Sequence, residues 1–163
     1  MRLIQRRYRP FNLTRCIMTA GESYFIPASE NDLSICVWCV RGGTQHDPSK
    51  PMTPVHLPQA GEGLLLNDGE SAWSNPMVGS NDLHLLAPVD TEWVCVSENG
   101  NGRHGLSAMV INGDAVVATG SGLLVVSGSV SLDGIMAGPD QYFAPRAAPI
   151  VVTGTGQAIL IRT

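Results

Sequence analysis

The cysteines and histidines are the residues of this sequence best suited to chemistry, and their spacing completes no catalytic or metal-binding motif. Cys36 and Cys39 form a Cys-x-x-Cys pair, which redox proteins place at a helix N-terminus, where the pKa of a thiol falls. Here the pair lies inside the apolar run 33–40, an expected strand, and strand residues three apart face opposite sides of a sheet. No second Cys-x-x-Cys is present to complete a zinc site. We therefore predict that Cys36 and Cys39, like Cys16 and Cys95, are buried thiols.

The four histidines lie in different segments of the chain. His46 is followed by Asp47, and a histidine beside a carboxylate can act as a general base. Adjacent residues of an extended chain point apart, so these two are not a preformed pair. His56 lies nearby in the same segment, and only His84 falls within an expected strand. We interpret His46 and His56 as surface residues of a loop rather than catalytic groups.

The tryptophans and two glycine pairs are the other residues that could bind a ligand. Trp73 lies in the polar context ESAWSNP and is the tryptophan best placed to stack on a sugar, whereas Trp38 and Trp93 are expected in the core. The glycine pairs at 120–122 and 154–156 are expected in hairpins with no helix after them, so they form no phosphate-binding loop.

The elements that would position these residues are β-strands. No window of the sequence keeps apolar residues at helical spacing over three turns, and short β-branched runs are divided by Gly, Pro, Asn, Asp and Ser. Strands at intervals of roughly 8–12 residues indicate a sandwich or barrel. The expected strands are 13–19, 23–27, 33–40, 63–67, 82–88, 92–97, 108–113, 115–119, 122–128, 130–135, 141–145, 150–154 and 157–163.

Two segments interrupt this rhythm. Residues 42–62 hold four prolines and three glycines, which predicts a long loop or a projecting arm. Residues 98–105 are polar and rich in glycine, and we expect them to connect two halves of one domain. Domain sizes of about 100–150 residues fit a single β domain over 13–163.

The charge is unevenly distributed along the chain. Five of the ten basic residues and none of the fourteen acidic residues lie within the first fifteen positions. We expect residues 1–12 to form a basic arm that docks on an acidic neighbour, which includes another copy of the chain. The acidic remainder disfavours binding to nucleic acid. The N-terminal arginines interrupt any secretory signal, and no apolar run reaches the roughly 20 residues that cross a bilayer.

The C-terminal half resembles the second half of a cupin, an all-β jelly roll. The matching features are Gly128, the turn Gly138-Pro139-Asp140, Pro145 and Gly156. The stretch PVDTEWVCVSENG is similar to small cupin-like proteins that phages encode. The resemblance implies a cupin-like jelly-roll sandwich or barrel with an N-terminal arm and a long proline-rich loop.

The cupin metal motif is missing from this sequence. The family's site requires His-x-His with a following Glu, and a further histidine on the second motif, all facing the barrel interior. The chain contains no His-x-His, and Pro149 stands near the position where the second motif would place its histidine. We therefore expect no metal and no other cofactor.

These observations favour a structural role over an enzymatic one. A charged share of 15% and an apolar share of 44% fit a surface that is partly covered in an oligomer, although a monomer with a Ser-, Thr-, Asn- and Gly-rich surface fits as well. We expect a phage virion component, such as a decoration, adaptor or fibre-linked protein, made in the host cytoplasm and bound to other copies or other virion proteins, with no membrane partner. The expected contact residues are Arg2, Arg6, Arg7, Arg9, His46, His56 and Trp73.

Two alternatives stay open. The first is a cupin-like epimerase or isomerase with a divergent, metal-free site, which would need a histidine together with a carboxylate or a tyrosine in one pocket. The second is a carbohydrate-binding module that uses Trp73.

Overall fold

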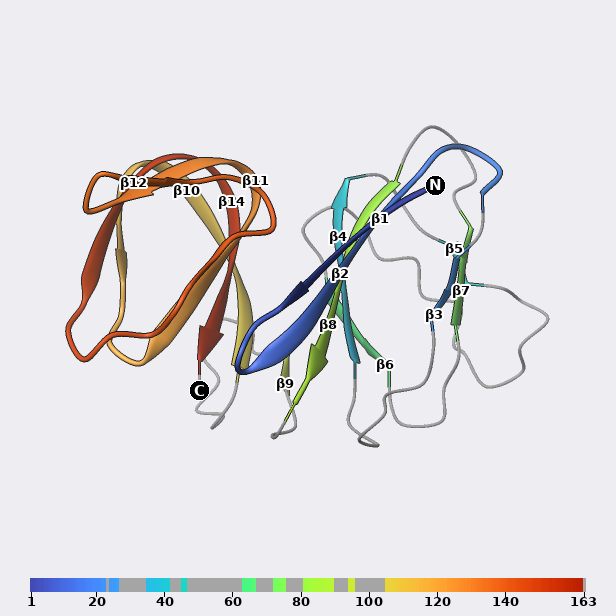
Figure 1. The fold of residues 1–163 in the computed structure, drawn as a ribbon, viewed down its shortest axis with the longest axis horizontal. Coiled ribbons are helices and arrows are strands. Elements are labelled where there is room, and N and C mark those ends of the chain that lie inside the picture. Colours follow the sequence, from blue (N-terminus) through green and yellow to red (C-terminus); the bar gives the residue numbers. More distant parts are fainter. Residues whose placement is uncertain are drawn as a thin grey trace. The chain divides into compact units, whose positions relative to one another are not determined.

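The computed structural model describes residues 1–22, 24–26, 35–41, 45–46, 63–66, 72–75, 81–89, 94–95 and 105–162. Every regular element within these residues is a β-strand, so the all-β prediction is confirmed (Figure 1). The chain forms two compact units, residues 1–93 and 94–163. A membrane-spanning helix was not found among the described residues.

The first unit contains two sheets. The larger sheet has the order β1-β2-β8-β4-β6 with all neighbours antiparallel. Its strands are β1 (Arg2–Arg7), β2 (Phe11–Met18), β8 (Asn81–Pro88), β4 (Ile35–Arg41) and β6 (Gly63–Leu66). The smaller sheet has the order β3-β7-β5, with β3 (Tyr24–Ile26), β7 (Ala72–Asn75) and β5 (Gln45–His46).

Both faces of the larger sheet carry buried side chains. Strand residues alternate between faces, and one face forms a hydrophobic cluster of Cys16, Met18, Ile35, Val37, Leu83 and Leu85. The opposite face holds buried Phe11, Leu13 and Leu86. It also holds the buried polar side chains of β8, Asp82 and His84. This face is therefore the candidate location of a functional site.

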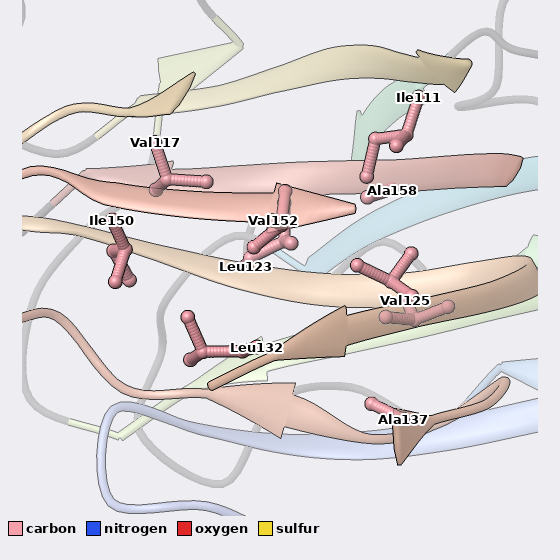
Figure 2. Close-up of a cluster of buried hydrophobic side chains, with 10 residues drawn as sticks. Ile111, Val117, Leu123, Val125, Leu132, Ala137, Ile150, Val152 and Ala158 are labelled. Atoms are coloured by element: carbon pink, nitrogen blue, oxygen red, sulfur yellow. The ribbon is translucent and has the colours of Figure 1, made fainter. Parts of the chain in front are cut away.

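The second unit is built on three long strands. They are β10 (Gly105–Val117), β11 (Ser121–Leu132) and β14 (Ile150–Arg162), with β14 between the other two. The short strands are β9 (Val94–Cys95), which pairs in parallel with β10, and β12 (Ile135–Ala137) and β13 (Tyr142–Phe143), which pair with β11. Figure 1 shows that the long strands curve strongly. Their inner side packs a core of ten buried residues, most of which are Val, Leu and Ile (Figure 2).

Each long strand replaces two strands expected from the sequence, because glycines bend it instead of ending it. Gly128 lies opposite Gly156 in the pairing of β11 with β14, and Gly128 has a φ of 81°. A Cβ atom at Gly128 would lie 2.1 Å from the carbonyl oxygen of Thr155, so only glycine permits this approach of the two backbones. The expectation of a hairpin at 154–156 is therefore wrong, since these residues lie within β14.

Two segments of the first unit gain detail from the structure. Arg2–Arg7, which lies within the expected basic arm, forms strand β1 and is paired with β2 along its whole length. Its six residues do not alternate between polar and apolar, so no sequence pattern indicated a strand there. Within 42–62, Gln45–His46 forms β5, and the other residues of that segment lie outside the described ranges. The extent of one domain over 13–163 stays a prediction.

Candidate functional site

A buried ion pair joins the two central strands β2 and β8 of the larger sheet. Arg15 donates two hydrogen bonds to the carboxylate of Asp82, from Nε to Oδ1 at 2.8 Å and from Nη2 to Oδ2 at 2.5 Å. The side chains are only 16% and 6% exposed. This two-pronged geometry matches a planar guanidinium to a planar carboxylate and fixes both groups in place.

His84 and Trp38 lie on the same face as this ion pair. The register places His84 of β8 between Arg15 of β2 and Trp38 of β4, and directly opposed residues of an antiparallel pair share a face. His84 is fully buried and Trp38 nearly so. Asp82 is two residues from His84, so its side chain is on that face as well. We call Arg15, Trp38, Asp82 and His84 the buried polar cluster.

The buried polar cluster was not found by reading the sequence, which placed His84 and Trp38 in separate expected strands and did not bring the four residues together. Arg15 and Asp82 are 67 positions apart, so only the pairing of β2 with β8 brings them together. The available signal was the Asp82-Leu83-His84 spacing, which puts two polar side chains on one face of an otherwise apolar strand. Charged groups in such surroundings are characteristic of functional sites as well as of structural ion pairs.

The buried polar cluster does not fit the metal site of cupins. It offers two groups of the kind that bind metal, the imidazole of His84 and the carboxylate of Asp82, and that carboxylate is bound by Arg15. The positive charge of the guanidinium beside this carboxylate also disfavours the binding of a metal cation there. Across the residues that the structure describes, no group of three or more His, Cys, Asp or Glu is arranged to hold a metal ion.

The edge strand β1 presents the arginines that the sequence singled out. Arg2, Arg6 and Arg7 are exposed on β1, and Arg9 is exposed just beyond its end. β1 is the terminal strand of its sheet within the described part of the chain. The side chains of Arg2 and Arg6 share one face, and that of Arg7 is on the other. We call Arg2–Arg7 the basic edge.

Both ends of the basic edge are fixed by local contacts. The N-terminal ammonium of Met1 forms an ion pair with Glu22, and the backbone N–H of Thr19 donates to Glu22 Oε2 at 2.8 Å. The hydrogen bond from the ammonium group, with that from Thr19, lowers the pKa of Glu22 to about 2. At the other end, the N–H of Tyr8 donates to the carbonyl of Phe11 at 2.9 Å and closes the hairpin.

The other expected contact residues lie elsewhere. His46 of β5 is paired with Ser74 of β7, and Trp73 of β7 is paired with Phe25 of β3. The structure therefore brings His46 and Trp73 into one three-stranded sheet, apart from the sheet of the basic edge. His56 lies outside the described residues, as does Asp47.

The tyrosines, which an enzyme could use as acids, pack against other groups of the chain. Tyr8 packs on Phe11, with ring centroids 5.2 Å apart, and Tyr24 lies against the hydrophobic cluster of the larger sheet. Tyr142 of the second unit lies over Gly122, where a Cβ atom would be 2.1 Å from its hydroxyl oxygen. Burial raises the pKa of Tyr142 to about 12, which makes it a poor proton donor near neutral pH.

The thiol prediction is confirmed where the structure describes the side chain. Cys16 and Cys36 are both buried. Burial is the main cause that raises the pKa of Cys16 to about 11, so its reactive thiolate form is rare at neutral pH. Cys39 and Cys95 lie within β4 and β9.

The outer face of the second unit is exposed and nearly neutral. On β10 it consists of Val110, Asn112, Asp114 and Val116, and on β14 of Val151, Thr153, Thr155 and Gln157, all of them exposed. We call these eight residues the neutral face. Its one charged group, Asp114, accepts a hydrogen bond of 2.7 Å from the hydroxyl of Thr153. Val116 and Val151 are directly opposed and remain 63% and 57% exposed.

Comparison with known proteins shows the fold alone. No protein-family model matches the sequence, and no curated protein matches it either. Among solved structures, the chain is similar to YhaK from Escherichia coli, with 13% identity, a TM-score of 0.63 and coverage of 98% of this chain and 92% of that one.

Two further structures agree with this result. A cupin 2 conserved barrel domain protein from Leptotrichia buccalis has 10% identity and a TM-score of 0.53, covering 99% of this chain and 89% of that one. The bacterial pirin YhhW from Escherichia coli, solved in complex with nickel(II), has 13% identity and a TM-score of 0.60, covering 93% and 81%. The cupin-like fold is thereby confirmed, whereas a phage origin stays a prediction.

Proposed function

We propose that this cupin-fold chain is a structural protein that assembles with other copies of itself, rather than an enzyme, and that the assembly in which it acts is a phage virion. The observation that carries the proposal is the neutral face. Among the described residues, seven large hydrophobic side chains are exposed, and five of them lie in the second unit. Three of these five, Val110, Val116 and Val151, belong to the neutral face.

Charge supports a second copy of the chain as the occupant of this face. The chain has a net charge of −4, so two copies repel each other wherever their acidic surfaces meet. The neutral face has only Asp114 as a charge, so it can meet its own equivalent at little electrostatic cost. Short hydroxyl and amide side chains between the valines supply hydrogen-bonding groups, as interfaces between subunits commonly do.

A pair of substitutions tests this interface. Val116→Asp with Val151→Asp places two carboxylates at one end of the neutral face, so an interface between two copies would contain four added negative charges. We expect the wild-type protein to elute as an oligomer in size-exclusion chromatography with light scattering, and the double variant to shift to the monomer mass.

A matched control adds the same charge away from the neutral face. Asn12→Asp with Ala20→Asp changes two exposed positions of the first unit and should leave the oligomer unchanged. An oligomer that survives the valine substitutions, or one that both double variants disperse equally, would contradict the neutral face as the interface. A monomeric wild-type protein would contradict self-assembly itself.

The enzyme alternative is supported by the buried polar cluster, because Asp82 and His84 lie on one face beside Arg15. An epimerase or isomerase with this site would bind a nucleotide sugar or a small carboxylic acid and would be stabilised against heat by it. We expect no rise in melting temperature with a panel of such ligands. A rise that His84→Gln abolishes would favour the enzyme, and sugar binding lost on Trp73→Ala would favour a carbohydrate-binding module.

A further inference from the structure

The basic edge is an ordered strand that can accept another strand. β1 ends the sheet among the described strands, and five of its six residues are exposed. A terminal strand presents backbone N–H and C=O groups to which an extended segment can bind. The contacts of Met1 with Glu22 and of Tyr8 with Phe11 hold β1 at both ends, so binding does not require the strand to form first.

The arginines determine what kind of segment fits. Directly opposed residues of neighbouring strands share a face, and opposite charges in such pairs are favourable. A segment opposite β1 therefore gains from acidic residues facing Arg2, Arg6 and Arg7. Apolar residues suit the positions opposite Leu3 and Ile4.

We infer that the basic edge binds an extended acidic segment of a different protein as an added antiparallel strand. Antiparallel pairing continues the pattern of every strand pair in this sheet. Read from its N-terminus, the added segment faces Arg7 first and Arg2 last. Its favoured pattern is therefore acidic, acidic, any residue, apolar, apolar, acidic.

The sequence of this chain shows why the partner is a different protein. Arg6 and Arg7 are adjacent, so a matching strand needs two adjacent acidic residues in either orientation. None of the fourteen acidic residues of this chain is next to another. A second copy therefore has no segment with the required pattern. This inference goes beyond the proposed self-assembly, because it uses a surface separate from the neutral face.

Two peptides of equal composition test the register. The matched peptide contains Glu-Glu-Thr-Val-Val-Glu, and the control contains Val-Val-Glu-Glu-Glu-Thr, which places its acids opposite Leu3, Ile4 and Gln5. Both carry the same charge, so a general attraction to basic protein affects them equally. We expect fluorescence anisotropy to show about ten-fold tighter binding of the matched peptide, from three favourable cross-strand pairs.

Variants of the protein separate the basic edge from general charge. Arg2→Gln with Arg6→Gln and Arg7→Gln should remove the preference for the matched peptide. Arg9→Gln with Arg146→Gln and Arg162→Gln removes the same charge outside β1 and should retain the preference. Hydrogen exchange should show slower exchange of backbone amides in residues 2–7 only when the matched peptide is bound.

Several results would contradict strand addition at β1. Equal binding of the two peptides, or no protection of residues 2–7, would overturn strand addition. Tighter binding of β1 to a second copy or to duplex DNA than to the matched peptide would overturn the choice of partner. If the peptide experiment fails but the valine substitutions still disperse the oligomer, the proposed function stands without strand addition. If the matched peptide binds as expected but the valine substitutions do not disperse the oligomer, strand addition stands without the proposed function.

Discussion

Arg15 and Asp82 are two opposite charges held almost out of water. Removing one member of such a pair leaves the other charge buried without compensation, whereas replacing both with apolar side chains leaves neither charge behind. The pair crosses two central strands of the larger sheet. Its contribution to the folded state can therefore be separated from any contribution to ligand binding.

We predict that Arg15→Met lowers the free energy of unfolding by about 3–5 kcal/mol. Adding Asp82→Leu in the same chain should recover most of that loss, because the remaining charge is then removed. Urea denaturation of the two single variants and the double variant measures the difference. A double variant that is less stable than both single variants would contradict this, because each side chain would then stabilise the fold through contacts other than the ion pair.

Single residues were predictable from sequence where their neighbours in the chain decide their surroundings. Cys16 and Cys36 lie in apolar β-rich runs, and both are buried thiols as expected. The partner of Asp82 was not predictable, because it depends on the register between strands far apart in the chain. The buried polar cluster is thus a product of strand pairing rather than of a local motif.

Glycines shape the backbone of the second unit, within strand β11 at Gly128 and in the turn between β11 and β12 at Gly134. Gly128 and Gly134 have nearly the same φ, 81° and 79°, but different surroundings. A Cβ atom at Gly128 would lie 2.1 Å from a backbone oxygen, whereas one at Gly134 would have nothing within 4 Å. An alanine at Gly134 would therefore introduce backbone strain alone, whereas an alanine at Gly128 would add steric overlap to the same strain.

We predict that Gly134→Ala costs about 1–2 kcal/mol, the usual penalty of a left-handed conformation for a residue with a Cβ atom. Gly128→Ala should cost more, about 3 kcal/mol or above, since the backbones of β11 and β14 must also separate. Thermal unfolding followed by circular dichroism compares them. Equal losses of stability would show that the close approach at Gly128 relaxes freely.

The strands show which local signals were reliable. Short apolar runs placed β2, β4, β6 and β8 within a few residues of their observed bounds. Glycine was read as the end of a strand, although in the second unit it allows the strand to bend and continue. β1 gave no alternating pattern because its solvent-exposed arginines lie on both faces, and an edge strand needs no apolar face.

At the scale of the whole chain, the sequence indicated the fold better than the function. The cupin resemblance in the C-terminal half predicted an architecture that solved structures with 10–13% identity confirm. A shared fold of this kind does not determine activity, since function depends on the particular side chains at a site. The proposal of an assembly protein therefore depends on surfaces of this chain, the neutral face and the basic edge.

Native mass spectrometry of the purified wild-type protein tests that proposal most directly, because one spectrum reports both the number of subunits and any bound metal ion. Our account predicts an oligomer whose mass is a whole multiple of the chain, with no metal ion in stoichiometric amount. A monomer that carries one transition-metal ion per chain would contradict it on both counts. Such a result would assign the protein to the metal-binding members of its fold.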